Sequence, residues 1–378
     1  MSNKKKYRFL FSVAMFSGNA TYYKNLVDLV SAMEDIDPTW LPIEWSPPEW
    51  FARIPPASLN WSIKGGLVTH SRVQALERSG RRFDAALFHH QLLPLWLFDF
   101  RKRVPMVITT DATPVLHDNY GKWYEKRMSL KYSLLSSAKR SMTRAVFQDA
   151  HYVLPFSDWV KRSLIDDYQT PAEHIEVIPP GINLSVWNNA AKSSDSQRPL
   201  RVLFVGGHFM RKGGDMVVRA AGRKEFSNCQ FDIVTQDAPM ALPENVRIHT
   251  HVTANSKEMI DLYNAADVFV LPTRADFHSW VSLEAMAMHL PVITTNVGAM
   301  SEIVDDGASG FIIPVDDEDA FTDRLHRLVE SEPMRARFGQ CGRNRVEHKF
   351  DLHVNIEKTI QYLKRAADKK QSATSVHH

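Results

Sequence analysis

Two carboxylates flank the start of an apolar helix pattern in the stretch RADFHSWVSLEAMAMHLPVITT, residues Arg274 to Thr295. Asp276 lies in the loop just after the apolar run DVFVLPT, separated from it by Arg274 and Ala275, and Glu284 lies inside the helix pattern after seven further residues. Strand-like runs on both sides predict a strand–helix–strand crossover. Because ligands gather beyond the carboxyl ends of strands in open α/β sheets, the loop that carries Asp276 is a candidate site.

A second candidate lies upstream, in LFVGGHFMRKGGDMVVRAAG, where a strand pattern ends at two glycines, Gly206 and Gly207. Glycines allow a close backbone approach, and the helix that follows offers unpaired N–H groups, so this turn suits a phosphate. Arg211 and Lys212 add full positive charges. The spacing matches neither G-x-G-x-x-G nor G-x-x-x-x-G-K-[ST], which disfavours a nicotinamide dehydrogenase and a P-loop NTPase. An ordinary glycine-rich turn with solvated basic residues stays an alternative.

Together the two segments suit a ligand with phosphate in its middle and hydroxyl groups at both ends. Carboxylates accept hydrogen bonds from hydroxyls but repel a diphosphate. Ser279 is the expected N-cap of the helix that carries Glu284, and its turn adds backbone N–H groups to the same place. A nucleotide sugar is such a ligand. The competing interpretation gives Glu284 a favourable place near a helix N-terminus and leaves Asp276 solvated in its loop.

These segments belong to a chain whose two halves each alternate strand and helix patterns. At 378 residues, with 44% hydrophobic and 24% charged residues, two cores are expected. The alternation predicts an α/β fold with parallel, doubly wound sheets. In the first half, strands are expected at the apolar runs YRFLFSV, WLPIEW, FDAALFHH, VPMVITTDAT, AHYVLPFS and IEVIPPG. In the second half, they are expected at LRVLFVGG, QFDIVTQ, VRIHTHV, DVFVLPT, PVITT and GFIIPV, and the terminal QSATSVHH is expected to be a disordered tail. We expect a first domain over residues 1–187, a polar linker over 188–199, a second domain over 200–350, and a C-terminal helix and tail over 351–378, with a return of that helix to the first domain as one alternative.

Composition narrows the functional classes. The formal charge of +3 gives no global nucleic-acid footprint. Cys229 and Cys341 fit no metal spacing or redox pair, which favours a reducing, cytoplasmic compartment. The apolar run near the start alternates like a strand rather than a secretion signal. The longest apolar run elsewhere, at 92–98, is far shorter than the roughly 20 residues of a membrane span.

The second half resembles the retaining glycosyltransferases of family 4, which have the GT-B fold of two Rossmann-like domains facing a central cleft. The resemblance is carried by VLFVGG...RKGGD, LYNAADVFVLPT, SLEAMAMHLPVITTNVGAMSEIV and DDGASGFIIPVDDEDAF, which cover nearly all of residues 200–350. The first half matches more loosely, through VLPFSDWVKRSLIDDY and IEVIPPGINLSVW.

The resemblance implies roles for individual residues. Lys212, helped by Arg211, would bind the donor diphosphate, and Glu284 would hold the ribose hydroxyls as the second acid of an E-x7-E motif. Asp276 stands where the family has the first glutamate and would contact the transferred sugar. Gly207 stands where the family often has arginine. Gly18, in FSGNATYY, resembles the glycine loop below the donor phosphates, although a plain strand-to-helix turn explains it too.

A further departure lies at VITTDATP, where the family often has His-Asp and this chain has Thr110-Asp111. Asp111 stays a candidate for the cleft. His89, His90 and His117 are candidate substitutes for the absent histidine, although a single histidine near a strand end is more often a hydrogen-bonded structural residue.

The resemblance implies front-face substitution, in which the leaving phosphate deprotonates the acceptor hydroxyl and the protein supplies positioning and charge. Such a reaction needs no cofactor and no metal. Asp-x-Asp occurs at 35–37 and 317–319, in a predicted turn and at a predicted helix start, and neither has the setting of a metal–nucleotide clamp.

Acceptor-side features are weaker. Trp45 and Trp50 belong to a tryptophan-rich segment and could stack on a sugar face, or serve only packing. Residues 122–146 form a basic amphipathic pattern that suits either peripheral contact with an anionic membrane or a helix packed on the sheet with a solvated basic face.

The resulting prediction is a retaining, metal-independent hexosyltransferase that uses a nucleotide diphosphate sugar and a hydroxyl acceptor. A GT-B sugar phosphorylase or epimerase is the nearest enzymatic alternative. The three departures from the family pattern motivate another alternative, a catalytically silent nucleotide-sugar-binding subunit.

Overall fold

The computed structural model describes residues 6–15, 18–55, 57–123, 130–188, 198–237 and 241–375. The chain divides into two compact units. Unit 1 comprises the chain up to Pro180 together with the C-terminal segment from His353, and unit 2 comprises Gly181–Leu352. The division falls at Pro180, before the polar stretch expected as a linker at 188–199, most of which lies outside the described residues.

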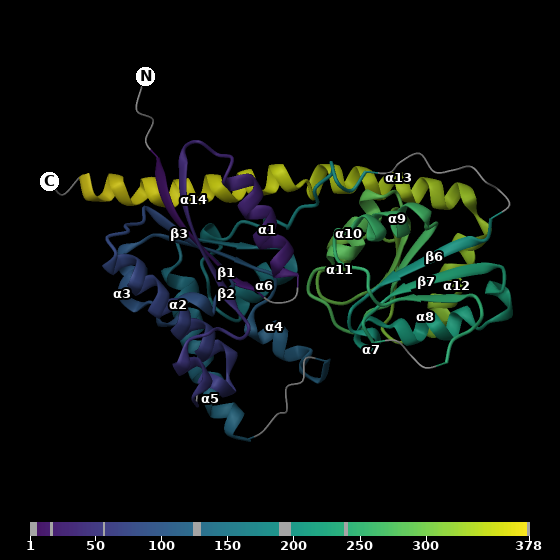
Figure 1. The fold of residues 1–378 in the computed structure, drawn as a ribbon, viewed down its shortest axis with the longest axis horizontal. Coiled ribbons are helices and arrows are strands. Elements are labelled where there is room, and N and C mark those ends of the chain that lie inside the picture. The colour runs from purple at the N-terminus through teal and green to yellow at the C-terminus, as the bar shows by residue number, and fades with distance from the viewer. Residues whose placement is uncertain are drawn as a thin grey trace. The chain divides into compact units, whose positions relative to one another are not determined.

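Unit 1 is built on a five-stranded parallel sheet with the order β2-β1-β3-β4-β5 (Figure 1). Its strands are β1 (Tyr7–Met15), β2 (Ile36–Glu44), β3 (Ala85–His89), β4 (Met106–Thr110) and β5 (Tyr152–Pro155). The order reverses between β1 and β3, so this is the second common doubly wound arrangement, with its switch point at those two strands.

The helices of unit 1 cover both faces of this sheet, as expected for strands buried on both sides. They are α1 (Asn19–Val30), α2 (Trp61–Arg78), α3 (Phe98–Arg103), α4 (Pro114–Asn119), α5 (Leu130–Asp149), α6 (Asp158–Asp166) and α14 (Leu352–Ser375). Alternate residues of β1 serve the two faces. Leu10 and Ala14 pack with Val68 and Phe100 from α2 and α3, while Phe11 stacks on Trp40 on the other face.

The C-terminal helix α14 belongs to unit 1. Asp368 accepts a hydrogen bond from the Tyr7 hydroxyl at 3.1 Å, Lys364 pairs with Asp35 at 2.6 Å, and the rings of Tyr152 and Tyr362 meet edge to face. Residues 371–375, part of the tail expected after the helix, continue α14.

One expected strand does not form. The run IEVIPPG, residues 175–181, makes only an isolated bridge between Ile175 and Val153, with a further backbone hydrogen bond from Ile178 to Pro155. Pro179 and Pro180 have no N–H group to extend the ladder, so this segment lies beside β5 without becoming a sixth strand.

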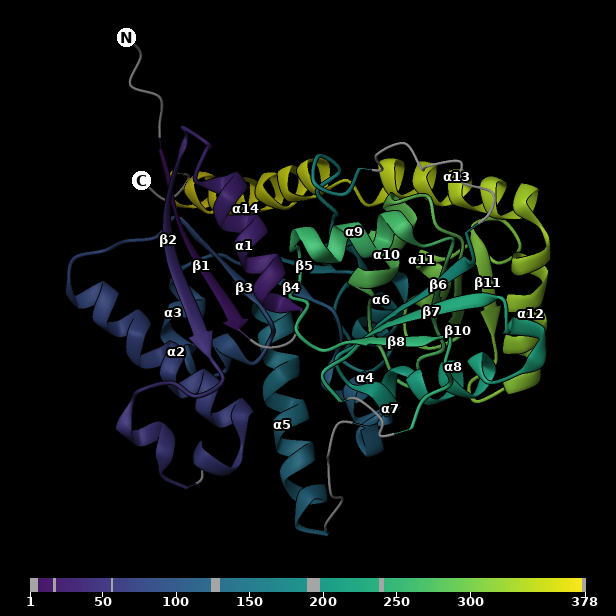
Figure 2. The same ribbon diagram turned by 45° about the vertical axis from the view of Figure 1, so that its right-hand side comes forward.

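Unit 2 is a six-stranded parallel sheet with the order β11-β10-β9-β6-β7-β8, which Figure 2 shows from the side. Its strands are β6 (Leu200–Val205), β7 (Cys229–Val234), β8 (Val246–His249), β9 (Val268–Leu271), β10 (Val292–Thr295) and β11 (Gly310–Ile313). All six were expected from the apolar runs. Read from β8, this is the Rossmann order 3-2-1-4-5-6, and its switch point lies between β6 and β9.

The helices of unit 2 lie on both faces of the sheet, with α8 and α12 on one face and α9 and α10 on the other. They are α7 (Phe209–Lys212), α8 (Gly214–Ala221), α9 (Lys257–Ala265), α10 (Trp280–Ala287), α11 (Met300–Ile303), α12 (Glu318–Glu330) and α13 (Glu332–Lys349). Short polar caps fix the starts of several of them. Ser256, Asp317 and Ser331 each accept a hydrogen bond from a backbone N–H in the first turn of α9, α12 and α13.

Candidate functional site

The two segments with candidate chemistry leave neighbouring strands of unit 2. One follows β6 and the other follows β9, and these strands pair in parallel through Val202 and Val268. Their carboxyl ends therefore meet at the switch point of the sheet, where ligands bind in folds of this kind. There the Nζ atom of Lys212 donates a hydrogen bond to the Asp276 carboxylate. Two residues that the sequence linked only by chemistry are thus in direct contact.

Glycines set the geometry of this contact. Gly213 has φ +81°, and a Cβ atom there would lie 2.1 Å from the carbonyl oxygen of Pro272, so only glycine lets the loop after β6 approach the loop after β9. A Cβ on Gly206 would lie 2.8 Å from Cβ of Lys212. By contrast, a Cβ on Gly207 would meet no atom within 4 Å, so space is open beside that backbone.

Lys212 was expected in a loop that leads into the helix starting near Gly214, but it lies in a short helix of its own. Arg211 and Lys212 end a separate one-turn helix, α7, and Gly213 separates it from α8. Arg211 uses its Nη1 atom to donate to the carbonyl oxygen of Ala275 at 2.7 Å. Both basic residues are therefore held against the Asp276 loop by their own hydrogen bonds.

The ion pair of Lys212 and Asp276 is largely shielded from solvent. The side chains keep 15% and 10% of their exposure, respectively. Burial lowers the pKa of Lys212, Asp276 acts against this, and Arg211 adds to the lowering. A buried ammonium group needs an anion beside it. Lys212 is consequently suited to an anionic ligand, with Asp276 as its partner in the structure described here.

A neighbouring arginine, absent from the sequence-based site, fixes the same loop. Arg274 donates through Nη1 and Nη2 to the two carboxylate oxygens of Asp215 at 2.6 and 2.8 Å, and its side chain is only 8% exposed. Burial alone would raise the pKa of Asp215, but hydrogen bonds from Arg274 and Arg219 lower it. This bidentate pair joins the start of α8 to the loop after β9. The sequence shows that Arg274 stands close to Asp276, but it does not show that Arg274 binds Asp215 on α8.

Glu284 lies on α10 and is 7% exposed. Ser279 is the N-cap of this helix, as expected, and accepts a hydrogen bond from the backbone N–H of Ser282. The Tyr263 hydroxyl, which sequence reasoning missed, donates to Oε2 of Glu284 at 3.0 Å. Burial raises the pKa of Glu284 to about 7, and the Tyr263 hydrogen bond opposes that rise. This carboxyl group therefore binds a proton more readily than an exposed glutamate does.

At the carboxyl edge of unit 1, the expected site residues belong mostly to neutral hydrogen-bond networks. Thr110 is fully buried and donates to Gln91 at 2.9 Å, so the residue in place of the family's histidine joins β4 to the turn after β3. His89 contacts Thr109 at 2.9 Å and Asn19 at 3.1 Å through its two ring nitrogens, and burial lowers its pKa to about 3. His89 is a structural residue in this arrangement.

The other unit 1 candidates are placed less tightly. Asp111 follows β4 directly and is partly exposed, and Gly18 is the N-cap of α1 with an ordinary φ of −65°. His117 lies on α4, and burial lowers the pKa of His90, to which nearby His89 and His117 contribute.

The acceptor-side tryptophans are accessible. Trp45 is 58% and Trp50 is 73% exposed. Trp45 lies parallel to Trp61, with ring centroids 5.9 Å apart and planes 8° apart. An exposed indole already stacked on a second ring presents one flat face, which suits either a sugar or another apolar surface.

The basic segment 122–146 is only partly described, because residues 124–129 and the side chains of 130–138 lie outside the described set. Arg140 and Arg144 donate to Asp167 at the end of α6, at 3.1–3.2 Å, and Val146 is buried. These arginines hold α5 against α6. Within the described residues, no helix is long and apolar enough to cross a membrane, and no group of three or more His, Cys, Asp or Glu residues could hold a metal ion.

Two family models match the chain. Residues 23–186 match glycosyltransferase family 4, and residues 199–331 match glycosyl transferases group 1. Among curated proteins, CapM of Staphylococcus aureus, a capsular polysaccharide biosynthesis glycosyltransferase, is 38% identical over 110 residues, which are 29% of this chain and 28% of CapM. The chain spans no more than half the length of the first three curated relatives that it matches.

Solved structures resemble the whole fold. Sucrose-phosphate synthase from Thermosynechococcus elongatus has a TM-score of 0.77 at 17% identity, covering 95% of this chain and 99% of that one. Anabaena HepE, solved with UDP, has a TM-score of 0.70 at 14% identity, covering 95% and 100%. At these identities the likeness shows the GT-B fold. Because these two glycosyltransferase models together match most of the chain, it belongs to the glycosyltransferases that they describe, group 1 and family 4.

Proposed function

We propose that this protein transfers a hexose from a nucleotide diphosphate sugar to a hydroxyl acceptor, with retention of anomeric configuration and without a metal ion. The observation that carries the proposal is the buried contact between Lys212 and Asp276 at the β6–β9 switch point, beside the open backbone at Gly207. Family membership supports the glycosyltransferase class of the reaction.

Each site residue has a role that fits its surroundings. The ammonium group of Lys212 would neutralise the diphosphate, with Arg211 as a second cation and the backbone at Gly206 and Gly207 close to the phosphate oxygens. Glu284, on α10, would accept hydrogen bonds from ribose hydroxyls. Asp276 would turn to the transferred sugar once the diphosphate takes its place beside Lys212.

The chemical step needs little from the protein besides position and charge. The bond between the sugar C1 and the phosphate oxygen breaks, and a bond forms from the acceptor oxygen to C1 on the same face. The acceptor proton passes to the leaving phosphate. Negative charge accumulates on the diphosphate as the bond breaks, so a fixed buried cation such as Lys212 stabilises the transition state more than the ground state.

The donor base is best tested first with UDP-sugars, because HepE was solved with UDP and shares this fold. A thermal-shift screen with UDP-, GDP- and ADP-sugars should show stabilisation by one base class, since a bound ligand raises stability with the logarithm of its excess over Kd. A reducing cytoplasmic setting belongs to the same proposal and is compatible with two free cysteines, Cys229 and Cys341.

The decisive experiment combines product analysis with two variants. Wild-type protein should form a glycosylated acceptor with retained configuration, and activity should survive EDTA. Lys212→Ala and Glu284→Ala should each lower kcat/KM by about 10²-fold or more while the fold persists. Lys257→Ala is a matched control, because that lysine is 87% exposed and forms an ion pair with Asp261 on the surface of α9.

The outcomes separate the alternatives. Release of sugar phosphate would indicate a phosphorylase, and conversion of donor without acceptor would indicate an epimerase. Tight donor binding with neither transfer nor slow hydrolysis would indicate a silent binding subunit. Full activity in both site variants would remove the residue assignment even if transfer occurs.

A further inference from the structure

Arg274 connects three segments at the carboxyl edge of the unit 2 sheet. It follows β9 and lies two residues before Asp276. Its guanidinium group donates to the carbonyl oxygen of Met210 on α7, to both carboxylate oxygens of Asp215 at the start of α8, and to Asp316 after β11. These partners are 64, 59 and 42 residues away along the chain, so the contacts join segments that only the fold brings together.

The backbone at Arg274 is fastened to the same short helix, α7. Its N–H group donates to the carbonyl oxygen of Arg211 at 2.8 Å, and the Arg211 side chain donates to the carbonyl oxygen of Ala275 at 2.7 Å. The Asp276 loop and the helix that ends at Lys212 are therefore joined by contacts other than the ion pair of these two residues. Breaking that ion pair leaves the other contacts in place.

A second restraint on the Asp276 loop comes from the loop after β10. Gly298 has φ +53°, and a Cβ atom there would lie 2.2 Å from the carbonyl oxygen of Asp276. The backbone N–H group of Ala299 also donates to the carbonyl oxygen of Phe277 at 3.0 Å. The backbone of Asp276 is thus held by Arg274 through its own loop and by direct contact with the Gly298 turn.

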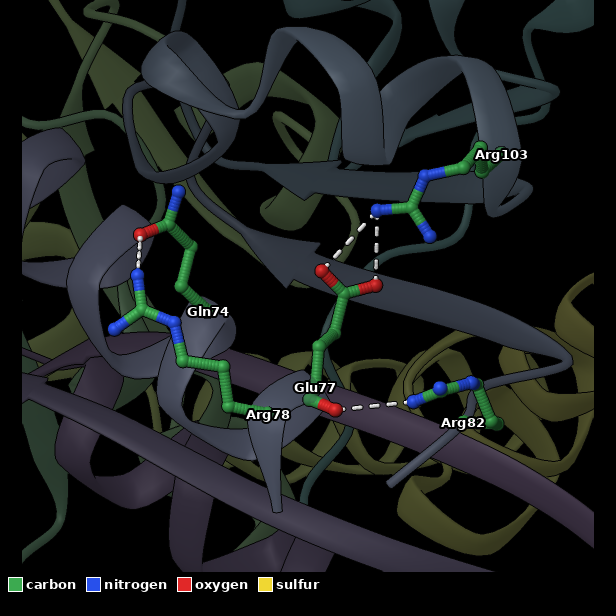
Figure 3. A pocket seen from close by; sticks show the side chains of 5 residues that line it. All are labelled: Gln74, Glu77, Arg78, Arg82 and Arg103. Atoms are coloured by element: carbon green, nitrogen blue, oxygen red, sulfur yellow. Dashed lines mark hydrogen bonds and ion pairs between the residues drawn. The ribbon is translucent and has the colours of Figure 1, made fainter. Parts of the chain in front are cut away.

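The contacts of Arg274 differ from those of arginines that only finish a helix. Figure 3 shows such a case in unit 1, where Arg78 and Arg82 donate to acceptors no more than five residues away. Those two arginines are exposed, whereas the Arg274 side chain is only 8% exposed. Burying a guanidinium group costs free energy that its carboxylate partners must offset. Helix capping does not explain a buried arginine in a loop beside the candidate site.

The short acid at position 276 makes a fixed loop more important. A glutamate would have one more rotatable bond and about 1.5 Å more reach, so it could compensate for a displaced backbone. Asp276 has less freedom, because Oδ1 accepts a hydrogen bond from the backbone N–H of Phe277 at 3.1 Å and Oδ2 accepts one from Lys212. The position of its carboxylate therefore follows the position of its backbone closely.

We propose that Arg274 is a positioning residue for the donor sugar, because it holds the Asp276 carboxylate where the transferred sugar binds. Arg274 acts through Asp276 and needs no contact with the donor itself. The role of Asp276 rests on the proposed function, but the coupling between Arg274 and Asp276 can be measured by binding alone.

The test is a double-mutant cycle on the full chain with Arg274→Gln and Asp276→Glu. The probes are UDP-glucose, GDP-glucose and ADP-glucose, with apparent Kd from titration calorimetry and kcat/KM for transfer from the probe that binds best. Arg274→Gln should weaken binding about tenfold in the Asp276 protein. In the Asp276→Glu background it should cost about twofold or less, because the longer acid recovers the lost reach. A merely structural role would lower the unfolding temperature and cost the same affinity in both backgrounds.

Two further variants complete the cycle. Arg219→Gln is the matched control, because Arg219 pairs with the same Asp215 at 3.0 Å but is 49% exposed on α8, and it should leave Kd near wild type. Arg274→Lys keeps the charge without the bidentate geometry, so it should recover only part of the affinity. It replaces Arg274→Gln in the cycle if the glutamine variant does not fold.

The outcomes separate this proposal from the proposed function. A cost of Arg274→Gln that depends on the residue at position 276 supports the proposal. Equal costs in the two backgrounds, or an equal effect of Arg219→Gln, overturn it even if the wild type transfers sugar. Coupled binding without any transfer would remove the proposed function and leave the positioning role. No binding of the wild type to any of the three probes would overturn both.

Discussion

The carboxyl edges of the two sheets are built from different chemistry. In unit 2 the edge carries charge: Lys212 against Asp276, and Glu284 with a pKa raised to about 7 by burial. In unit 1 the corresponding edge carries neutral partners, with Thr110 bonded to Gln91 and a neutral His89 between Thr109 and Asn19. Both edges are well packed, so packing alone does not explain the difference.

The comparison distinguishes groups that can serve a ligand from groups that serve the fold. Neutral buried donors and acceptors that satisfy each other stabilise a turn at little cost. A buried charge costs free energy unless a partner offsets it. Such a charge can interact strongly with an anion or a hydroxyl of a bound ligand. In the proposed function, the donor chemistry therefore rests on the charged groups of the unit 2 edge.

The largest effect should follow removal of the Asp276 charge. We expect Asp276→Asn to lower kcat by about 10²–10³-fold, because the amide can neither orient the sugar as an acceptor of two hydrogen bonds nor balance Lys212 before donor binds. Steady-state kinetics against donor measure this. Asp261→Asn, at an exposed acid of α9, should leave kcat near wild type. Equal rates for wild type and Asp276→Asn would show that the charge of Asp276 on the unit 2 edge is not needed for the reaction.

Glu284→Gln should separate activity from stability. We expect kcat/KM to fall about 10–10²-fold through the lost ribose contact. The raised pKa means that the carboxyl contributes stability below pH about 4.5, and this is lost as pH rises through about 7. The glutamine does not titrate. Between these two pH values, the free energy of unfolding of the variant, measured with urea, should therefore rise by up to about 3 kcal/mol relative to wild type. A difference that is constant with pH would contradict the burial argument.

Tyr263→Phe should change the pH profile more than the maximum rate. Its hydroxyl lowers the pKa of Glu284, so its removal raises that pKa further. At neutral pH we expect roughly a tenfold loss of kcat/KM, recovering as alkaline pH ionises Glu284. Tyr22→Phe, a buried tyrosine of unit 1, is the matched control. If both variants keep the wild-type profile, Tyr263 has only a packing role.

The smallest effect on activity should come from the unit 1 edge. Thr110→Val removes the donor to Gln91 in a fully buried place, which should lower the free energy of unfolding by about 1–3 kcal/mol. Activity of the folded protein should stay close to wild type. A stable Thr110→Val protein with little activity would show that this edge takes part in the chemistry after all.

The sequence predicted much of the framework, because its signals are local. Apolar runs marked all six strands of unit 2, and Ser279 was recognisable as a cap for α10. The strand prediction failed at IEVIPPG, because its β-rich composition was given more weight than Pro179 and Pro180, which cannot donate to a ladder. Sequence reasoning also missed α7, since a single helical turn has too few residues to show a period.

The sequence by itself determined the residue types of the site: a glycine turn with Arg211 and Lys212, and two acids around a capped helix. Only the tertiary structure decided which of them meet. The strand order puts β6 beside β9, Gly213 permits the close approach of their loops, and Tyr263 reaches Glu284 from another helix. Such contacts depend on strand order and on residues distant in the chain, and local patterns in one sequence carry information on neither.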